Sequence, residues 1–273
     1  MTNRFFKPFL IAAGLAAIGT EASEIYAPDL AGLPSASVTI LGEVHDNPQH
    51  HVNQAAAVAA LAPKALVFEM LTEEQALRIT PGALADQDRL GALLGWGETG
   101  WPDFAMYYPI FEAGEGAAVF GGAVPRDRVR RAVGEGAAAV FGGAAPLFGL
   151  DDALDDHVQT EREAGQMAAH CDALPIEMLP GMVEAQRLRD AGLAQAVIAA
   201  LAETGGPVVV ITGNGHARRD WGAPSLLQIA QPDLDILSIA QFESAPEGEV
   251  PFDHWLVTEP APREDPCAVF AKD

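Results

Sequence analysis

Short apolar runs alternate with longer segments of helical periodicity along most of this chain. Mostly apolar runs bounded by glycine or polar residues predict strands at 37–41, 65–68, 117–121, 208–212 and 254–258. Apolar residues that recur every three or four positions predict helices at 48–61, 73–79, 90–94, 104–113, 127–133, 152–169 and 180–202. The alternation is typical of an α/β fold with a mainly parallel central sheet flanked by helices.

The pattern also predicts the domain organisation. The stretch between the third and fourth predicted strands is long and mostly helical, so we expect a helical insertion at about residues 150–203, packed beside the sheet. Residues 23–259 are expected to form a single domain. The residues from 260 to 273 are rich in proline and charge, which predicts a loosely ordered tail.

The N-terminal segment has the three-part layout of a secretory signal peptide. Arg4 and Lys7 precede the apolar run PFLIAAGLAAIG, and small residues follow up to Ala22. The run is shorter than the roughly 20 residues that span a bilayer, which favours a cleaved signal at residues 1–22 over a membrane anchor. No cysteine follows the run for lipid attachment. We therefore expect a periplasmic or secreted protein.

Charge and cysteine content narrow the possible partners. The 273 residues include 16 Lys+Arg and 38 Asp+Glu, a formal net charge of −22. Such a chain repels a phosphate backbone, so nucleic acid is not an expected partner. In an oxidising compartment Cys171 and Cys267 can pair, although their spacing alone does not decide whether they do.

The stretch LGEVHDNPQHH raises three alternatives: a metal-ligand cluster, a catalytic base with its supports, or a polar helix start. Asn47 and Pro48 are typical of an N-cap and a first helical position. Glu43 and His45 therefore lie in the connection at the carboxyl end of a strand, where parallel sheets bind ligands. Of the adjacent His50 and His51, which begin the helix, at most one is expected to face the same site.

A second strand ends with the same spacing. Gly213 and His216 in VVVITGNGHARR repeat the spacing of Gly42 and His45, and Glu69 follows the strand in LVFEM. If these strands are parallel neighbours, their polar ends converge. The candidate catalytic residues are then Glu43, His45, Glu69 and His216, and the two histidines are the candidate ligands of a divalent metal ion such as zinc.

The middle of the chain is rich in aromatic residues with helical spacing, within GWGETGWPDFAMYYPIF. Core packing explains such spacing, and so does a pocket for a flat apolar cofactor, to which a tyrosine can offer an oxygen ligand for iron. The arginines that follow, Arg126 to Arg131, can pair with anionic ligand groups or form a solvated helix face. On the helix at 180–202, Gln186, Arg189 and Asp190 are candidates for lining a site, with structural salt bridges as the alternative.

Six segments in series resemble the ChaN-like haem-binding uptake family of the wider Tiki/TraB and erythromycin-esterase superfamily. They are LGEVHDNPQHH, LVFEM, YYPIF, HCDALP, MLPGMVEAQRLRDAGLA and GNGHARRDWGAP, and the match extends over about residues 37–239. The resemblance implies an α/β fold and a periplasmic haem-binding protein of bacterial haem or iron acquisition. It also implies a homodimer when loaded with haem, with outer-membrane haem-uptake components as possible partners.

The resemblance assigns haem contacts as well. The family's Tyr-x-Pro motif falls on Tyr107 and Pro109, which implies that Tyr107 is the axial iron ligand, although Tyr108 stands beside it. The other candidate haem contacts are Trp101, Met106, His51 and Arg218. The superfamily also contains hydrolases that use strand-end Glu and His residues, so the alternative is a metal-dependent protease- or esterase-like enzyme.

Overall fold

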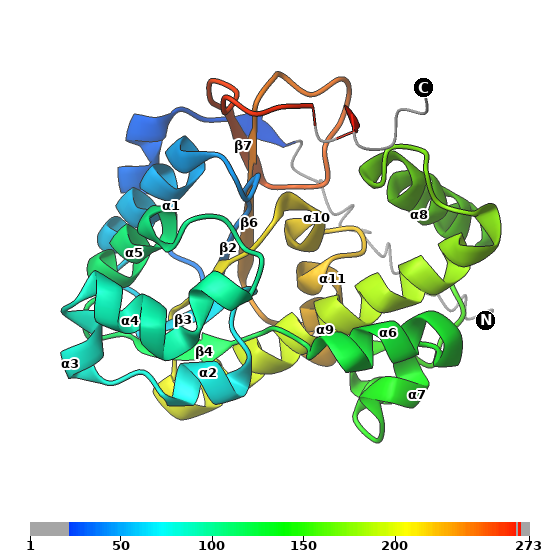
Figure 1. Ribbon diagram of the computed structural model, residues 1–273, viewed down its shortest axis with the longest axis horizontal. Coiled ribbons are helices and arrows are strands. Elements are labelled where there is room, and N and C mark those ends of the chain that lie inside the picture. Colours follow the sequence, from blue (N-terminus) through cyan, green and yellow to red (C-terminus); the bar gives the residue numbers. More distant parts are fainter. Residues whose placement is uncertain (1–21, 266, 269–273) are drawn as a thin grey trace, which may run out of the picture.

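A seven-stranded sheet forms the centre of the computed structural model, which describes residues 22–265, 267 and 268. All of its strands run parallel, in the order β1-β7-β6-β2-β5-β3-β4, which confirms the predicted α/β fold (Figure 1). The strands are β1 (Ser23–Glu24), β2 (Val38–Leu41), β3 (Ala65–Phe68), β4 (Ala118–Gly121), β5 (Val208–Ile211), β6 (Ile236–Phe242) and β7 (His254–Val257).

The three strands that lead to the site are apolar on both faces except for the buried Thr39 of β2. Every residue of β2, β3 and β5 is buried, as expected for parallel strands that helices cover on both sides. Val38 and Ala65 both pair with Val208, so the carboxyl ends of these strands lie level with one another. The residues that follow each strand therefore emerge side by side.

Helices cover both faces of the sheet. Alternate residues of the strands point to opposite faces and contribute to two separate cores. The first core includes α1 (Pro48–Leu61), α4 (Gln87–Leu94) and α5 (Phe104–Ala113). The second includes α6 (Arg126–Glu135), α7 (Ala137–Phe141), α9 (Leu179–Thr204) and α11 (Ala223–Ala230) (Figure 1). The remaining helices are α2 (Glu73–Leu77), α3 (Pro81–Leu84), α8 (Asp156–Ala169) and α10 (Asn214–Ala217). Short 3-10 turns lie at Ala27–Gly32, Trp96–Glu98, Ala145–Phe148 and Ile176–Met178.

The predicted elements agree with the observed ones in most places. Helices α1 and α5 have the predicted bounds, and each predicted strand is present within one residue at either end. Strands β1 and β6 and helices α3, α7, α10 and α11 were not predicted. Within the expected helical insertion, α8 packs on α9, and α9 contributes Leu188, Ala194 and Val197 to the core against the sheet.

Residues 1–21 lie outside the described part of the chain, so the expected signal peptide is not observed apart from Ala22. In the described part, no helix has the length and apolar character required to cross a membrane.

Contacts hold part of the C-terminal tail against the body of the protein. Arg263 pairs with Asp46 at 2.7 Å and with Glu243 at 2.5 Å, and Asn47 donates to Glu243 at 2.7 Å. Hydrogen bonds from Arg263 are the main reason that the pKa of Glu243 falls to about 2. Further along the tail, Cys267 forms a disulfide with Cys171, the pairing that spacing alone left open.

Glu243→Gln is expected to lower the free energy of unfolding by about 1 kcal/mol near neutral pH, a value reduced for solvent screening at this partly exposed site. Because the pKa of Glu243 falls from 4.5 to about 2 on folding, its contribution is complete above pH 4.5 and disappears as the pH falls through 2. Urea unfolding of the wild type and of Glu243→Gln at several pH values should show that the difference between their free energies of unfolding becomes smaller as the pH falls from 4.5 to 2. The exposed Glu247→Gln serves as the control, and a gap of constant size would contradict the assignment.

Candidate functional site

The polar ends of β2, β3 and β5 meet at the carboxyl edge of the sheet, as predicted. Oε1 of Glu69 lies 3.9 Å from Nε2 of His45 and 3.4 Å from Nε2 of His216. The turn after β2 depends on close packing, because a side chain at Gly42 would collide with Asn214. The structure thus brings together all four candidate catalytic residues, Glu43 included, from three separate strand ends.

Glu43 is the centre of the first cluster. It is 2% exposed, and its Oε1 accepts hydrogen bonds from Nδ1 of His45 at 2.7 Å and from the hydroxyl of Tyr107 at 2.8 Å. Nδ1 of His51 lies 3.5 Å from the other oxygen, Oε2. A carboxylate can only accept, so His45 presents a protonated Nδ1 to Glu43 and directs Nε2 away from it.

The helix start divides the remaining polar residues as expected. Asn47 accepts from the amide of Gln49 and caps α1, whose first residue is Pro48. His51 faces Glu43, whereas His50 turns away, accepts from the amide of Val44 and contacts Thr258. Burial lowers the pKa of His50 to about 4, so this imidazole is neutral. Its hydrogen bonds stabilise the loop after β2, and it does not take part in the site.

Glu69 is the centre of the second cluster. Its Oε2 accepts from the Thr212 hydroxyl at 2.7 Å and the Gly213 amide at 2.8 Å, and Arg189 reaches its Oε1 at 2.6 Å. Burial alone would raise the pKa of Glu69, but His216, His45 and Arg189 hold it well below its usual range. The carboxylate is therefore a fixed negative charge between two imidazoles.

His216 is a buried cation between two carboxylates. Its Nδ1 donates to Asp190 at 2.6 Å while its Nε2 faces Glu69, and Arg162 lies 3.7 Å from the far oxygen of Asp190. Burial lowers the pKa of His216, but the charges of Glu69 and Asp190 outweigh burial and raise this pKa to about 9. Burial raises the pKa of Asp190, and the charges of His216 and Arg162 oppose that rise.

This bonding pattern does not support the predicted divalent metal site at His45 and His216. A zinc ligand must offer an unshared nitrogen lone pair, whereas both nitrogens of His216 face carboxylates. Nowhere in the described part of the chain do three or more His, Cys, Asp or Glu side chains have an arrangement that could hold a metal ion.

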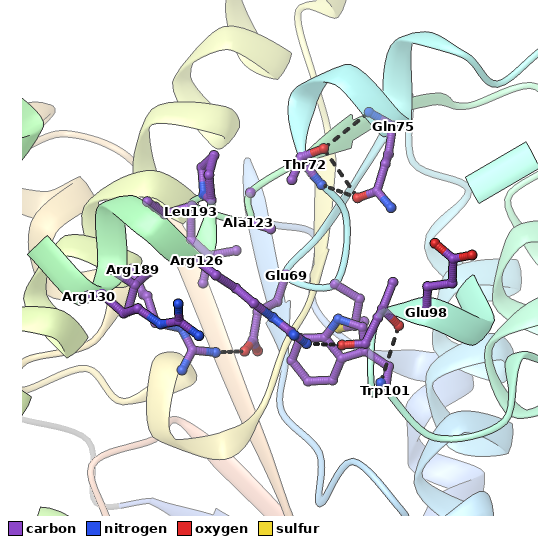
Figure 2. Close-up of a pocket in the computed structure, with 16 residues that line it drawn as sticks. Glu69, Thr72, Gln75, Glu98, Trp101, Ala123, Arg126, Arg130, Arg189 and Leu193 are labelled. Carbon is purple, nitrogen blue, oxygen red and sulfur yellow. Dashed lines mark hydrogen bonds and ion pairs between the residues drawn. The ribbon is translucent and has the colours of Figure 1, made fainter. Parts of the chain in front are cut away.

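A cavity of about 570 Å³ opens beside the Glu69 cluster. Figure 2 shows Arg126, Arg130 and Arg189 reaching it from α6 and α9, with Trp101 on the opposite wall. Met70, Val124, Val129 and Leu193 add apolar surface. Arg189 pairs with Glu69 and Arg126 donates to the carbonyl of Thr99, whereas Arg130 makes no hydrogen bond or ion pair with other described residues.

The chain matches a protein family over residues 30–227, which is most of its length. That family is described as haem-binding uptake, Tiki superfamily, ChaN. The chain belongs to this family. Among solved structures it is similar to one described as cofacial heme binding to ChaN of Campylobacter jejuni, with 17% identity and a TM-score of 0.60, covering 83% of this chain and 88% of that one.

A second solved structure, of the type III effector HopBA1, is 14% identical with a TM-score of 0.45 and covers 86% of this chain and 94% of that one. No curated protein matched the chain. The ChaN structure, at under a fifth identity, supports the fold, and the family match supports haem binding in uptake.

The features of the cavity suit the haem of the ChaN family. Haem presents a large apolar face and two carboxylates, and the cavity combines apolar walls and the ring of Trp101 with three arginines. Among the described residues, the Arg130 guanidinium has no hydrogen-bond or ion-pair partner, so it can pair with an anionic group of a ligand. Trp101 is the implied haem contact that lines this cavity.

The other implied haem contacts lie elsewhere. The Tyr108 hydroxyl donates to Leu84 and the ring lines a separate cavity, while Met106 packs against the core around α5. His51 is buried with its Nε2 on the carbonyl of His45. Arg218 pairs with Asp220 and lies over the ring of Trp221. The structure does not bring these four residues together with Trp101 at the cavity.

Tyr107 does not have the surroundings of an iron ligand in this structure. The side chain is fully buried, beneath the rings of His51 at 4.2 Å and Trp96 at 4.9 Å, and its hydroxyl donates to Glu43. Burial, followed by the charge of Glu43, raises the pKa of Tyr107 above its usual value. Iron binds a tyrosine as phenolate, which this environment opposes.

Several site residues had only weak sequence signals. Arg189 and Asp190 were candidates on α9, but their adjacent positions in the sequence did not predict their separate partners. Arg189 binds Glu69, and Asp190 binds His216. The side-chain nitrogen of Gln186, one turn before Asp190, lies 3.0 Å from Nδ1 of His216. Arg162 on α8 was missed because nothing near it in the sequence indicates its contact with Asp190.

Proposed function

We propose that this protein binds haem in the bacterial periplasm as part of haem or iron uptake. The match to the ChaN family over residues 30–227 carries the proposal. The apolar cavity with Arg126, Arg130 and Arg189 at its rim supports it, because these are the surfaces and charges that the porphyrin and its propionates require.

Residues of the cavity have distinct parts in this proposal. Trp101 and the apolar wall cover the macrocycle and exclude water, while Arg130 and Arg126 pair with propionates. Arg189 holds the Glu69 carboxylate in place, so that the floor of the cavity keeps a fixed charge pattern when the ligand enters. When bound, haem supplies the iron that the uptake system carries.

The location and assembly are part of the same proposal. Residues 1–22 act as an export signal, and the loaded protein forms a homodimer that exchanges haem with outer-membrane uptake components. The cofacial haem binding described for ChaN of Campylobacter jejuni supports the dimer, because two stacked haems need two sites that face each other. Light scattering before and after haemin addition tests this assembly, which a purely monomeric loaded protein would contradict.

Titration of the full chain with haemin should give a saturable shift of the Soret band. Arg130→Ala is expected to weaken haemin binding about tenfold through the loss of a charge-assisted hydrogen bond. Arg131→Ala is the matched control, since the next residue of α6 pairs with Glu135 and does not line the cavity. Absence of a saturable shift would overturn the function, and equal effects of the two variants would move the haem away from this cavity.

A further inference from the structure

A second cavity, of about 700 Å³, lies at the end of the sheet where β4 is the last strand. Its walls come from the segment that holds α2 and α3, from α5 and from β4, and they include the apolar side chains of Ile79, Leu84 and Phe111. Helix α2 lies beside β4 and contributes Leu77 to this cavity and Gln75 to the arginine-rimmed one (Figure 1). The two cavities share no lining residue, so they are separate sites.

Strand β4 is an open edge of the sheet. Its four residues are all partly exposed, whereas those of β2, β3 and β5 are buried. The amide of Ala118 donates to the carbonyl of Lys64, and that of Gly122 donates to Phe68. Because the bonding direction alternates along a strand, Val119 points its N–H and C=O away from β3. Outside the pairing of β3 with β4, Val119 forms no backbone hydrogen bond with any described residue, so this edge can accept another strand.

The rim of the second cavity combines an exposed apolar side chain with two carboxylates. Leu77 is 79% exposed, the largest value among the large hydrophobic residues in the described part of the chain. Glu112 and Glu115 are exposed, and neither forms an ion pair with another described residue. Among the described residues that line the cavity, none is Lys or Arg. The rim therefore complements a ligand that is both apolar and cationic.

We propose that the β4 edge and this cavity form a docking site for a cationic extended segment of another protein, which adds to the sheet as a further strand. Val119 supplies main-chain hydrogen bonds, and alternate apolar side chains of the segment enter the cavity. Lys or Arg residues of the segment pair with Glu112 and Glu115. A second copy of this chain is a poor occupant, because both copies carry a net charge of −22.

A fluorescently labelled eight-residue peptide of alternating Lys and Val tests the proposal with the full chain and without haemin. Fluorescence anisotropy should show saturable binding. The same peptide with Glu in place of Lys should bind at least about tenfold more weakly, because its charges repel the acidic rim. Equal binding of the two peptides, or no saturable binding of the Lys–Val peptide, would overturn the proposal. The assay contains no haem, so its outcome is separate from that of the proposed function.

N-methylation of the peptide tests the main-chain bonds without changing the protein. Val119 packs against the core on the α5 side of the sheet, so the valines of an added strand point to the same side. An antiparallel strand then bonds to Val119 through its valine amides, and a parallel strand bonds through its lysine amides. N-methyl groups on one set should weaken binding at least about tenfold, and those on the other set less than about threefold. Similar effects of the two sets would contradict strand addition.

Charge variants locate the peptide on the protein. Glu112→Gln combined with Glu115→Gln should weaken binding of the Lys–Val peptide about tenfold. Glu247→Gln combined with Glu249→Gln is the matched control, since it removes the same charge from exposed positions that do not line the cavity, and should change binding less than about twofold. Equal losses in the two double variants would mean that the peptide responds to net charge alone, which would overturn the site.

Apolar variants test the rim in the same assay. Leu77→Ala should weaken peptide binding about tenfold, whereas Ile176→Ala, at a position that is 74% exposed but does not line the cavity, should leave it unchanged. Both side chains are exposed, so both variants are expected to fold. Equal binding by the two variants would contradict the proposal. Analytical ultracentrifugation of the unloaded chain completes the test, because self-association that Leu77→Ala abolishes would assign the surface to a second copy and overturn the proposal.

Discussion

His216→Leu is expected to lower the free energy of unfolding by about 3–5 kcal/mol near pH 6, the range for removing one partner of a buried ion pair. Leucine leaves Asp190 facing only Arg162, at 3.7 Å, and leaves Glu69 dependent on Arg189 for its close cationic partner. Both carboxylates are buried, so neither can replace the lost imidazolium with water. Urea unfolding monitored by circular dichroism measures the change.

The pH dependence of the same substitution separates loss of charge from loss of packing. Because folding raises the pKa of His216 from 6.5 to about 9, its ionic contribution is complete below pH 6.5 and is lost as the pH rises through 9. The difference in the free energy of unfolding between the wild type and His216→Leu should therefore become smaller as the pH rises from 6.5 to 9. His157→Leu, at a site 82% exposed, should change stability by less than about 0.5 kcal/mol at either pH. A gap that does not depend on pH would mean that His216 contributes packing alone.

Convergence of the strand ends was predictable because it depends on topology more than on side-chain detail. Repetition of the Gly-x-x-His spacing placed His45 and His216 at equivalent positions after two strands, and adjacent parallel strands bring such positions together. Glu69 follows from the same reasoning through the pairing of β3 with β5. The sequence does not show how the protons are shared, which depends on Asp190 and Arg189 across the helix layer.

Two other features could not be predicted because they depend on burial depth. Strand β6 contains Ser238 and Gln241, which interrupt its apolar run, but both are buried with their side chains bonded to backbone oxygens of distant residues. Tyr107 has the helical spacing of a core residue and also matches a ligand motif. Only the structure distinguishes the two, by showing the phenol on Glu43 in the interior.

Replacing both cysteines, Cys171→Ser with Cys267→Ser, is expected to lower the free energy of unfolding by about 3 kcal/mol. The bond joins residues 96 positions apart, so it restricts the unfolded chain strongly. It also fixes the tail near the end of α8, the helix whose Arg162 faces Asp190 in the site. Urea unfolding of the variant should match that of the wild type under reducing conditions, and a mismatch would show an effect of the serines themselves.

Coupling between the disulfide and the Arg263 ion pairs gives a sharper test of this anchoring. Both fix the same tail, the disulfide to residue 171 and Arg263 to Asp46 and Glu243. Once the disulfide is absent, the tail can detach before the domain unfolds, so Glu243→Gln should cost less than the about 1 kcal/mol expected when the bond is present. A double-mutant cycle compares the effect of Glu243→Gln on the free energy of unfolding in the wild type and in the variant that lacks both cysteines. If the two effects are equal, the disulfide and the ion pairs act independently, and the tail does not detach before the domain unfolds.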